Sequence, residues 1–93
     1  MAQHRVTCIT KNPPHSNRHE HITHIGGAGW YITREEAIRQ IDAKINEFYI
    51  YDDARKIYAW VGVVRPTIGL PYLRTYADRD WNDNLLSLGD CRA

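Results

Sequence analysis

Histidine is the residue type in this sequence best suited to holding a metal ion, and four of the five histidines lie in one stretch: His15, His19, His21 and His24. In a strand, His19 and His21 would share one face and His24 would lie on the other. Zinc needs three or four converging ligands; Cys8 on a neighbouring strand could add one, but no CxxC or HExxH spacing completes the set. His19 and His21 are therefore candidates for a metal-dependent enzyme. The alternative is a polar hairpin edge, with no metal and no other cofactor, and this is the interpretation we adopt.

Carboxylates at alternating positions in residues 78–84, DRDWNDN, resemble the start of a calcium-binding loop. Such a loop needs glycine at its sharp turn, where Asp83 stands, and a bidentate glutamate where Gly89 stands. Asp and Asn side chains also bond their own backbone in turns, and Asp83 could cap a short turn over residues 84–88. We therefore interpret the acidic stretch as a structural turn.

Aromatic side chains form a third set, suited to binding rather than to catalysis. Residues 48–51 and 56–64 alternate, so their aliphatic side chains share one face of a sheet and their aromatic side chains the other. The aromatic set is Tyr49, Tyr51, Tyr58 and Trp60, and Tyr72 and Tyr76 would extend it. Beside Arg74, Arg55 or Arg65, such rings could stack on single-stranded nucleic acid. They could equally anchor a protein interface. The structural alternative is that Trp81, Leu85, Leu86 and Leu88 fold back and cover this face as a second core.

Two cysteines, Cys8 and Cys91, lie near the two ends of the chain. Neither begins a predicted helix that would lower its pKa, and no base is identifiable beside them, so no nucleophile is indicated. The N-terminus lacks a long apolar segment of the secretory type. We therefore expect a cytoplasmic protein whose cysteines stay as thiols, and a disulfide that joins the two ends of the chain is the less favoured alternative.

Patterns along the chain predict the strands that carry these side chains. Residues 5–10 and 20–26 predict two strands, joined by a loop containing Pro13 and Pro14 and followed by the glycine-rich segment 26–29. Residues 48–51 and 56–64 predict a β-hairpin, and residues 72–77 predict a last strand.

A helix is predicted between these strand pairs, from about residue 34 to residue 44. Thr33 and Glu36 fit a capping box, in which each side chain bonds the backbone N–H of the other residue. Ala37, Ile38, Ile41 and Ile45 then fall on one helical face, which we expect to pack on the aliphatic side of the sheet.

The C-terminal stretch 72–91 combines the last strand, the polar turn and the apolar residues Leu85, Leu86 and Leu88, which are too apolar for a loose terminus. We therefore expect residues 84–88 to pack on the sheet. The YLRT, AD and DNLLSL segments of this stretch resemble a family of small bacterial proteins, domain-of-unknown-function family 3892. Residues 21–26, HITHIG, and 30–38, WYITREEAI, resemble the same family. The resemblance implies no activity, substrate or catalytic residue.

Composition is that of an ordinary globular protein: 93 residues form one domain, residues 1–93, with 43% hydrophobic and 25% charged residues. The net charge of +1 argues against duplex DNA or an anionic membrane as partner. The predicted fold is α+β, an antiparallel sheet of about five strands with one helix packed on it, in the order ββαβββ. We expect a non-catalytic binding domain that contacts a protein, a second copy included, through Tyr49, Tyr51, Tyr58, Trp60 and Arg74. The metal-dependent enzyme and the single-stranded nucleic-acid binder are the alternatives.

Overall fold

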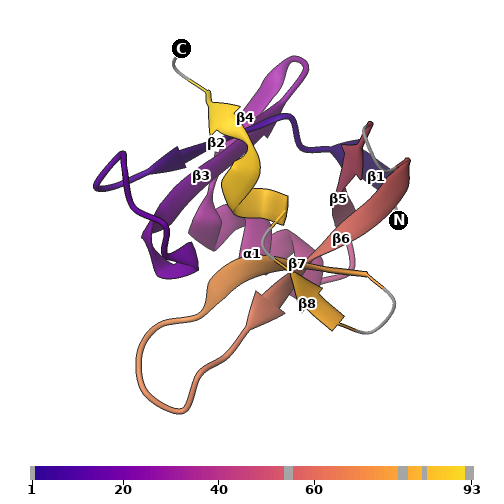
Figure 1. Ribbon diagram of the computed structural model, residues 1–93. Coiled ribbons are helices and arrows are strands. Elements are labelled where there is room, and N and C mark those ends of the chain that lie inside the picture. Colours follow the sequence, from indigo (N-terminus) through magenta and orange to yellow (C-terminus); the bar gives the residue numbers. More distant parts are fainter. Residues whose placement is uncertain (1, 54–55, 78–79, 83, 92–93) are drawn as a thin grey trace.

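The computed structural model describes residues 2–53, 56–77, 80–82 and 84–91, and its strands form two sheets (Figure 1). The five-stranded sheet has the order β1 (Ala2–Arg5), β5 (Asn46–Asp52), β6 (Ile57–Val64), β7 (Tyr72–Ala77) and β8 (Asp80–Asn82). The four-stranded sheet has the order β4 (Trp30–Thr33), β3 (Ile22–Gly27), β2 (Cys8–Lys11) and β9 (Gly89–Asp90). The helices are α1 (Arg34–Asp42) and the 3₁₀ turns η1 (His19–His21) and η2 (Asn84–Ser87).

The α+β class is therefore confirmed, whereas a single antiparallel sheet in the order ββαβββ is wrong. Strands β5 to β8 form an antiparallel meander, as the predicted hairpin and last strand require. Two pairs, however, are parallel: β1 with β5, and β2 with β9. Both join segments far apart in the sequence, which an alternation pattern in a single strand does not reveal.

The predicted strand 5–10 is two strands, because the chain crosses between the sheets after Arg5. Val6 donates its N–H to the Tyr49 carbonyl at 2.7 Å in the five-stranded sheet. The next residue, Thr7, donates to the Gly26 carbonyl at 2.9 Å in the other sheet. Val6 itself is buried, so the crossing is anchored in the core.

The second predicted strand, 20–26, is also corrected at both ends. Residues 19–21 form the turn η1, so β3 begins only at Ile22. The glycine-rich segment does not simply end the strand: it turns the chain back into β4, which the sequence interpretation missed. Gly29 has φ +79° in this turn, a left-handed conformation that glycine adopts without strain.

Helix α1 begins where predicted, with Thr33 Oγ1 accepting the Glu36 N–H at 3.0 Å. Only this half of the capping box is seen, since the Glu36 carboxylate accepts hydrogen bonds from Arg39 and Gln40 instead. Ala37 is buried, and Ile38 and Ile41 pack against the core as expected. Ile45 was wrongly placed on this face: it follows the helix and is 48% exposed. Within the described residues, no helix is long and apolar enough to cross a membrane.

The C-terminal tail closes the core, as predicted. Leu85 is fully buried, and Leu86 and Leu88 pack beside it; in Figure 1 this yellow segment lies between the two sheets. The buried Thr75 hydroxyl fixes the tail to β7, because it accepts the Leu85 N–H at 3.2 Å and donates to the Asn82 side chain. The predicted cap, Asp83, lies outside the described residues.

A disulfide joins Cys8 to Cys91, so the expectation of free thiols is wrong. The pairing follows from β9, which lies parallel to β2 with Gly89 opposite Cys8. Cys91 then follows directly, and its N–H donates to the Ile9 carbonyl at 3.1 Å. The tail is thus held by an apolar residue, a strand pair and a covalent bond.

Candidate binding surfaces

Strand register brings the predicted aromatic residues together on the side of the five-stranded sheet opposite the core. Tyr49 lies opposite Trp60, Tyr51 opposite Tyr58, and Trp60 opposite Tyr76, so these side chains share one face. Trp81 of β8 lies opposite Tyr76 and joins them. We call this surface, Tyr49, Tyr51, Tyr58, Trp60, Tyr76 and Trp81, the aromatic face.

The rings of the aromatic face are tilted against one another. Tyr51 and Tyr58 have centroids 4.8 Å apart at 56°, and Tyr49 and Trp60 have centroids 5.7 Å apart at 58°. Tyr49 also contacts Tyr58, which links the two pairs into one cluster. These separations and angles lie in the favourable range for aromatic pairs, so the cluster is held in place before any partner binds.

A glycine in the middle of the sheet lets the second pair of rings lie close to the backbone. A Cβ on Gly62 would come within 3.0 Å of the Tyr76 ring and 3.1 Å of the Trp81 ring. Tyr76 and Trp81 pack edge to face, with centroids 5.5 Å apart at 74°. Gly62 is thus part of the surface, although it carries no side chain.

Among the described residues, two arginines lie on this side of the sheet; Arg55 lies outside them. The Arg5 guanidinium is 5.6 Å from the centroid of the Tyr51 ring, and Arg5 also pairs with Asp53 at 3.7 Å. Arg74 lies opposite Gly62, and its Nε donates to the Asn82 carbonyl at 3.2 Å. Arg74 was among the predicted binding residues, whereas Arg5 was missed because its parallel pairing with β5 is non-local.

The tail does not cover the aromatic face as the structural alternative required. Leu85, Leu86 and Leu88 pack on the opposite, aliphatic side of the sheet, and only Trp81 lies on the aromatic side. Tyr58 is 58% exposed and Trp81 is 45% exposed, while Tyr49, Tyr51 and Trp60 are half-buried. The described tail thus leaves the predicted binding residues accessible.

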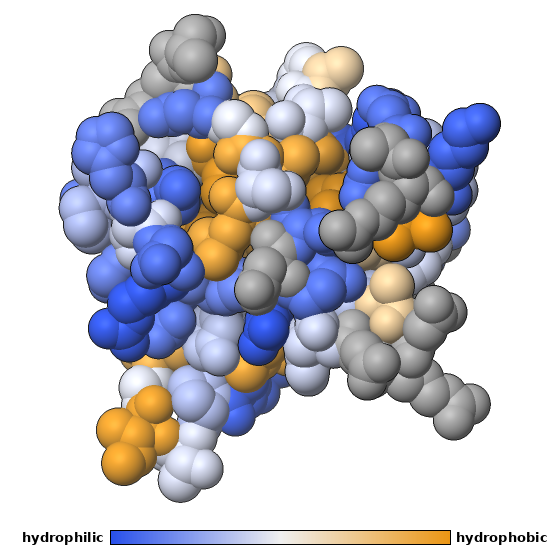
Figure 2. Space-filling model, in the orientation of Figure 1, coloured by the Kyte–Doolittle hydropathy of each residue, from blue (hydrophilic) through white to orange (hydrophobic). Residues whose placement is uncertain are grey.

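Tyr72 does not extend this surface, although its parity in β7 places it there. Its ring stacks on the His19 imidazole, with centroids 6.4 Å apart at 29°. At this end of the sheet the loop between β6 and β7 carries the exposed side chains Ile68 and Leu70. Figure 2 shows a small hydrophobic tip at the lower left, where this loop lies in Figure 1.

The histidines do not converge in the way a metal site requires. His19 is buried against Tyr72, and His21 Nδ1 is 2.6 Å from the Ser16 hydroxyl. His24 stacks on Tyr31 with centroids 4.7 Å apart. In the part of the chain that the structure describes, no group of three His, Cys, Asp or Glu side chains could hold a metal ion. Asp78 and Asp83 of the acidic stretch lie outside that part.

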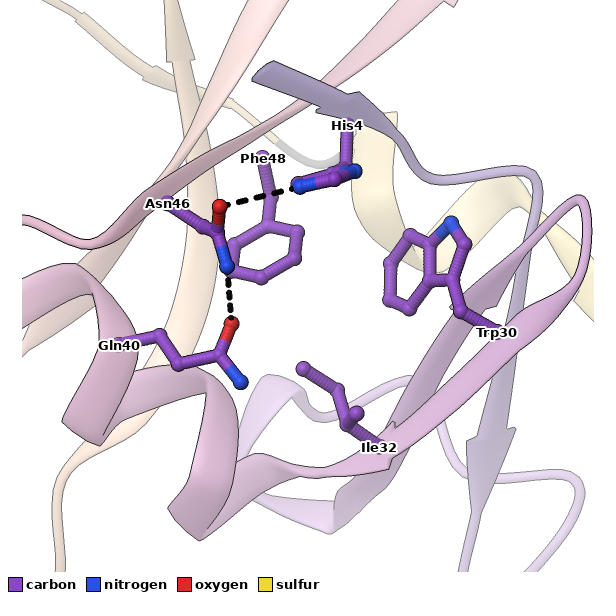
Figure 3. Close-up of a pocket in the computed structure, with 6 residues that line it drawn as sticks. All are labelled: His4, Trp30, Ile32, Gln40, Asn46 and Phe48. Atoms are coloured by element: carbon purple, nitrogen blue, oxygen red, sulfur yellow. Dashed lines mark hydrogen bonds between the residues drawn. The ribbon is translucent and has the colours of Figure 1, made fainter. Parts of the chain in front are cut away.

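A pocket between the sheets is the feature that sequence reasoning missed (Figure 3). It is lined by His4, Trp30, Ile32, Gln40, Asn46 and Phe48, which come from β1, β4, α1 and β5. No local pattern relates these positions. The signal that could have found part of it is Asn46, a polar residue at the start of a strand whose alternation places it on the core side with Phe48.

A family model described as "Protein of unknown function (DUF3892)" matches residues 5–89 of the chain. No curated protein and no solved structure matches the chain. The match covers the helix and both sheets except for residues 2–4 of β1 and Asp90 of β9.

Proposed function

Because the chain belongs to the DUF3892 family, whose description assigns no activity, we propose a function from geometry: a single, non-catalytic domain that binds another protein through its aromatic face. The observation that carries the proposal is that the aromatic cluster lies on the side of the sheet that the core does not use. Helix α1 and Leu85 pack on the aliphatic side. The exposed rings are therefore not explained by folding.

The composition of the surface supports a protein partner. Tyrosine, tryptophan and arginine are enriched among the residues that dominate binding energy at protein interfaces. Here Tyr58 and Trp81 are exposed beside the half-buried Trp60, and Arg5 lies over Tyr51 at the edge. The mutual packing of the rings lowers the entropic cost of ordering them when a partner binds.

Single-stranded nucleic acid fits this surface less well. Bases stack on ring faces that are free to receive them, and the phosphates need a track of cations. Here the rings engage one another at 52–58°, and Arg5 is paired with Asp53. The net charge of the chain is only +1. The metal-dependent enzyme is also disfavoured, since His19 and His21 contact Tyr72 and Ser16, respectively.

The cellular compartment bears on the choice of partner. Disulfides are typical of oxidising compartments and rare in the cytosol. The bond between Cys8 and Cys91 therefore argues against a cytoplasmic location.

The test is quantitative affinity capture followed by reconstitution with the purified captured protein. We expect Tyr58→Ala and Trp60→Ala to weaken binding about tenfold or more, the effect of removing an interface anchor. Ile68→Ala is the matched control, because this side chain is 90% exposed and apolar but lies away from the aromatic face. It should bind as the wild type does.

Two further measurements distinguish the alternatives. Sedimentation analysis of the protein alone reports self-association, and a dimer lost in Tyr58→Ala would make the partner a second copy. Titration with short oligonucleotides tests the nucleic-acid interpretation. Salt-dependent oligonucleotide binding that Tyr58→Ala and Trp60→Ala abolish would overturn the proposal of a protein partner.

A further inference from the structure

The pocket between the sheets is walled largely by rings and is independent of the aromatic face. Trp30 and Phe48 have centroids 5.4 Å apart, and His4 lies 5.8 Å from Phe48 and 6.1 Å from Trp30. Ile32 completes the apolar wall. In Figure 3 these side chains surround an open centre, with the two amides on the side opposite Trp30.

A glycine is required for this arrangement. A Cβ on Gly27 would lie 2.5 Å from Trp30 Nε1 and 2.4 Å from the Arg5 carbonyl oxygen. Any side chain at residue 27 would therefore displace the indole and separate β3 from the end of β1. Trp30 can reach the pocket because residue 27 is glycine.

The polar wall is a directed chain of hydrogen bonds that begins at Glu36. Arg39 and Gln40 lower the pKa of the Glu36 carboxyl to about 2, so the group is ionised and only accepts. Gln40 must therefore present its Nε2 to Glu36, at 2.7 Å, and its Oε1 to Asn46 Nδ2, at 2.9 Å. Asn46 Oδ1 then faces His4 Nε2, at 3.1 Å, which must carry the hydrogen.

This chain of hydrogen bonds leaves unused donors and acceptors on the amides that line the pocket. Each side-chain amide has two N–H hydrogens and two acceptor lone pairs, and each bond above uses one of them. Asn46 and Gln40 thus keep both donor and acceptor capacity, fixed in orientation by Glu36. Since no lining side chain is a carboxylate, lysine or arginine, the wall suits a neutral polar group.

We propose that this pocket binds a small, uncharged, planar compound of one aromatic ring that carries a single hydrogen-bonding group. Its volume is about 230 Å³. That exceeds the roughly 150 Å³ of an apolar cavity known to hold benzene, but is below the roughly 300 Å³ at which pockets for drug-sized ligands begin. The ring packs against the wall formed by Trp30, Phe48 and Ile32, and its polar group bonds the amides of Asn46 and Gln40.

The experiment is an NMR titration of the ¹⁵N-labelled protein with phenol, with toluene as its isosteric apolar match and with benzoate as its charged match. Phenol should shift the resonances of the Trp30 indole N–H and the Asn46 and Gln40 amides. Toluene should bind about threefold to tenfold more weakly, the effect of one lost hydrogen bond. Benzoate should bind more weakly still, because no lysine or arginine lines the pocket to pair with its charge.

Three variants test whether phenol binds in this pocket. Ile32→Trp fills the pocket and should abolish phenol binding, while Asn46→Ala should reduce the preference for phenol over toluene, because only the Gln40 amide remains. Tyr58→Ala, on the aromatic face, should change neither, which separates this proposal from the protein-binding one. Wild-type shifts confined to the aromatic face, or undiminished binding by folded Ile32→Trp, would overturn the inference. If Ile32→Trp does not fold, the location of the wild-type shifts and the Asn46→Ala comparison decide it.

Discussion

The two sides of the five-stranded sheet are built from the same strands but covered differently. On one side, aliphatic residues and a single phenylalanine are buried beneath α1 and η2: Phe48, Ile50, Ala59, Val61 and Leu73. On the other side, the alternate positions of the same strands carry Tyr49, Tyr51, Tyr58, Trp60 and Tyr76. Of the described C-terminal residues, Trp81 alone joins that side, and its indole packs on Tyr76 over Gly62.

This contrast separates residues that make the fold from residues that are available for binding. A solvent-facing side of an antiparallel sheet normally alternates polar residues with the buried ones. Large aromatic residues gathered at those positions exceed what folding requires, since the core is already closed by Leu85 and Ala37. Exposed apolar clusters of this kind mark interaction sites.

Substitutions of one residue from each side of the sheet should differ strongly in how far they lower the free energy of unfolding. Leu85→Ala should lower the free energy of unfolding by about 2–5 kcal/mol, because it leaves a cavity in a fully buried site. Tyr58→Ala should change it by less than about 1 kcal/mol, as expected for a largely exposed side chain. Urea denaturation measures both. Equal losses would show that the aromatic face is part of the folding core.

The parts of the fold that could be predicted are those whose partners are close in sequence. Strands β5 and β6 are close in sequence, so the alternation from Phe48 to Val64 was enough to sort the two sides correctly. Helix α1 carries its start signal at Thr33. The apolar tail was expected on the sheet, and Leu85 is its fully buried residue.

The parts that could not be predicted depend on contacts between distant segments. The alternation in residues 5–10 would be the same if these residues formed one strand or parts of two. The crossing between the sheets at Val6 is what divides them. The disulfide depends on the pairing of β9 with β2, which a compartment argument cannot reveal. The pocket brings His4 to Asn46, 42 positions away, through a parallel pair that no local pattern predicts.

A substitution at the N-terminal cap of α1, with a smaller expected effect, tests how the helix is held on the core side. Thr33→Ala should lower the free energy of unfolding by about 1 kcal/mol, because the Glu36 N–H loses its acceptor. Lys11→Ala, in a half-exposed strand-end position away from the helix, is the control and should have little effect. An unchanged denaturation midpoint and slope for Thr33→Ala would mean that the cap does not contribute to stability.

The smallest effect concerns the exposed rim of the helix, where Glu36 connects the surface to the amides of the pocket. Bonds from Arg39 and then Gln40 lower the pKa of Glu36 from 4.5 to about 2. A carboxyl whose pKa is lower in the folded state contributes stability above pH 4.5, which is lost as the pH falls towards 2. Because solvent screens this exposed group, the loss should be modest.

Glu36→Gln should flatten this part of the stability profile measured by denaturation between pH 4.5 and 2. Arg39→Ala should flatten it in part, since the Gln40 bond remains. If the profile of Glu36→Gln matched that of the wild type, the carboxylate would not be the anchor of the amide chain.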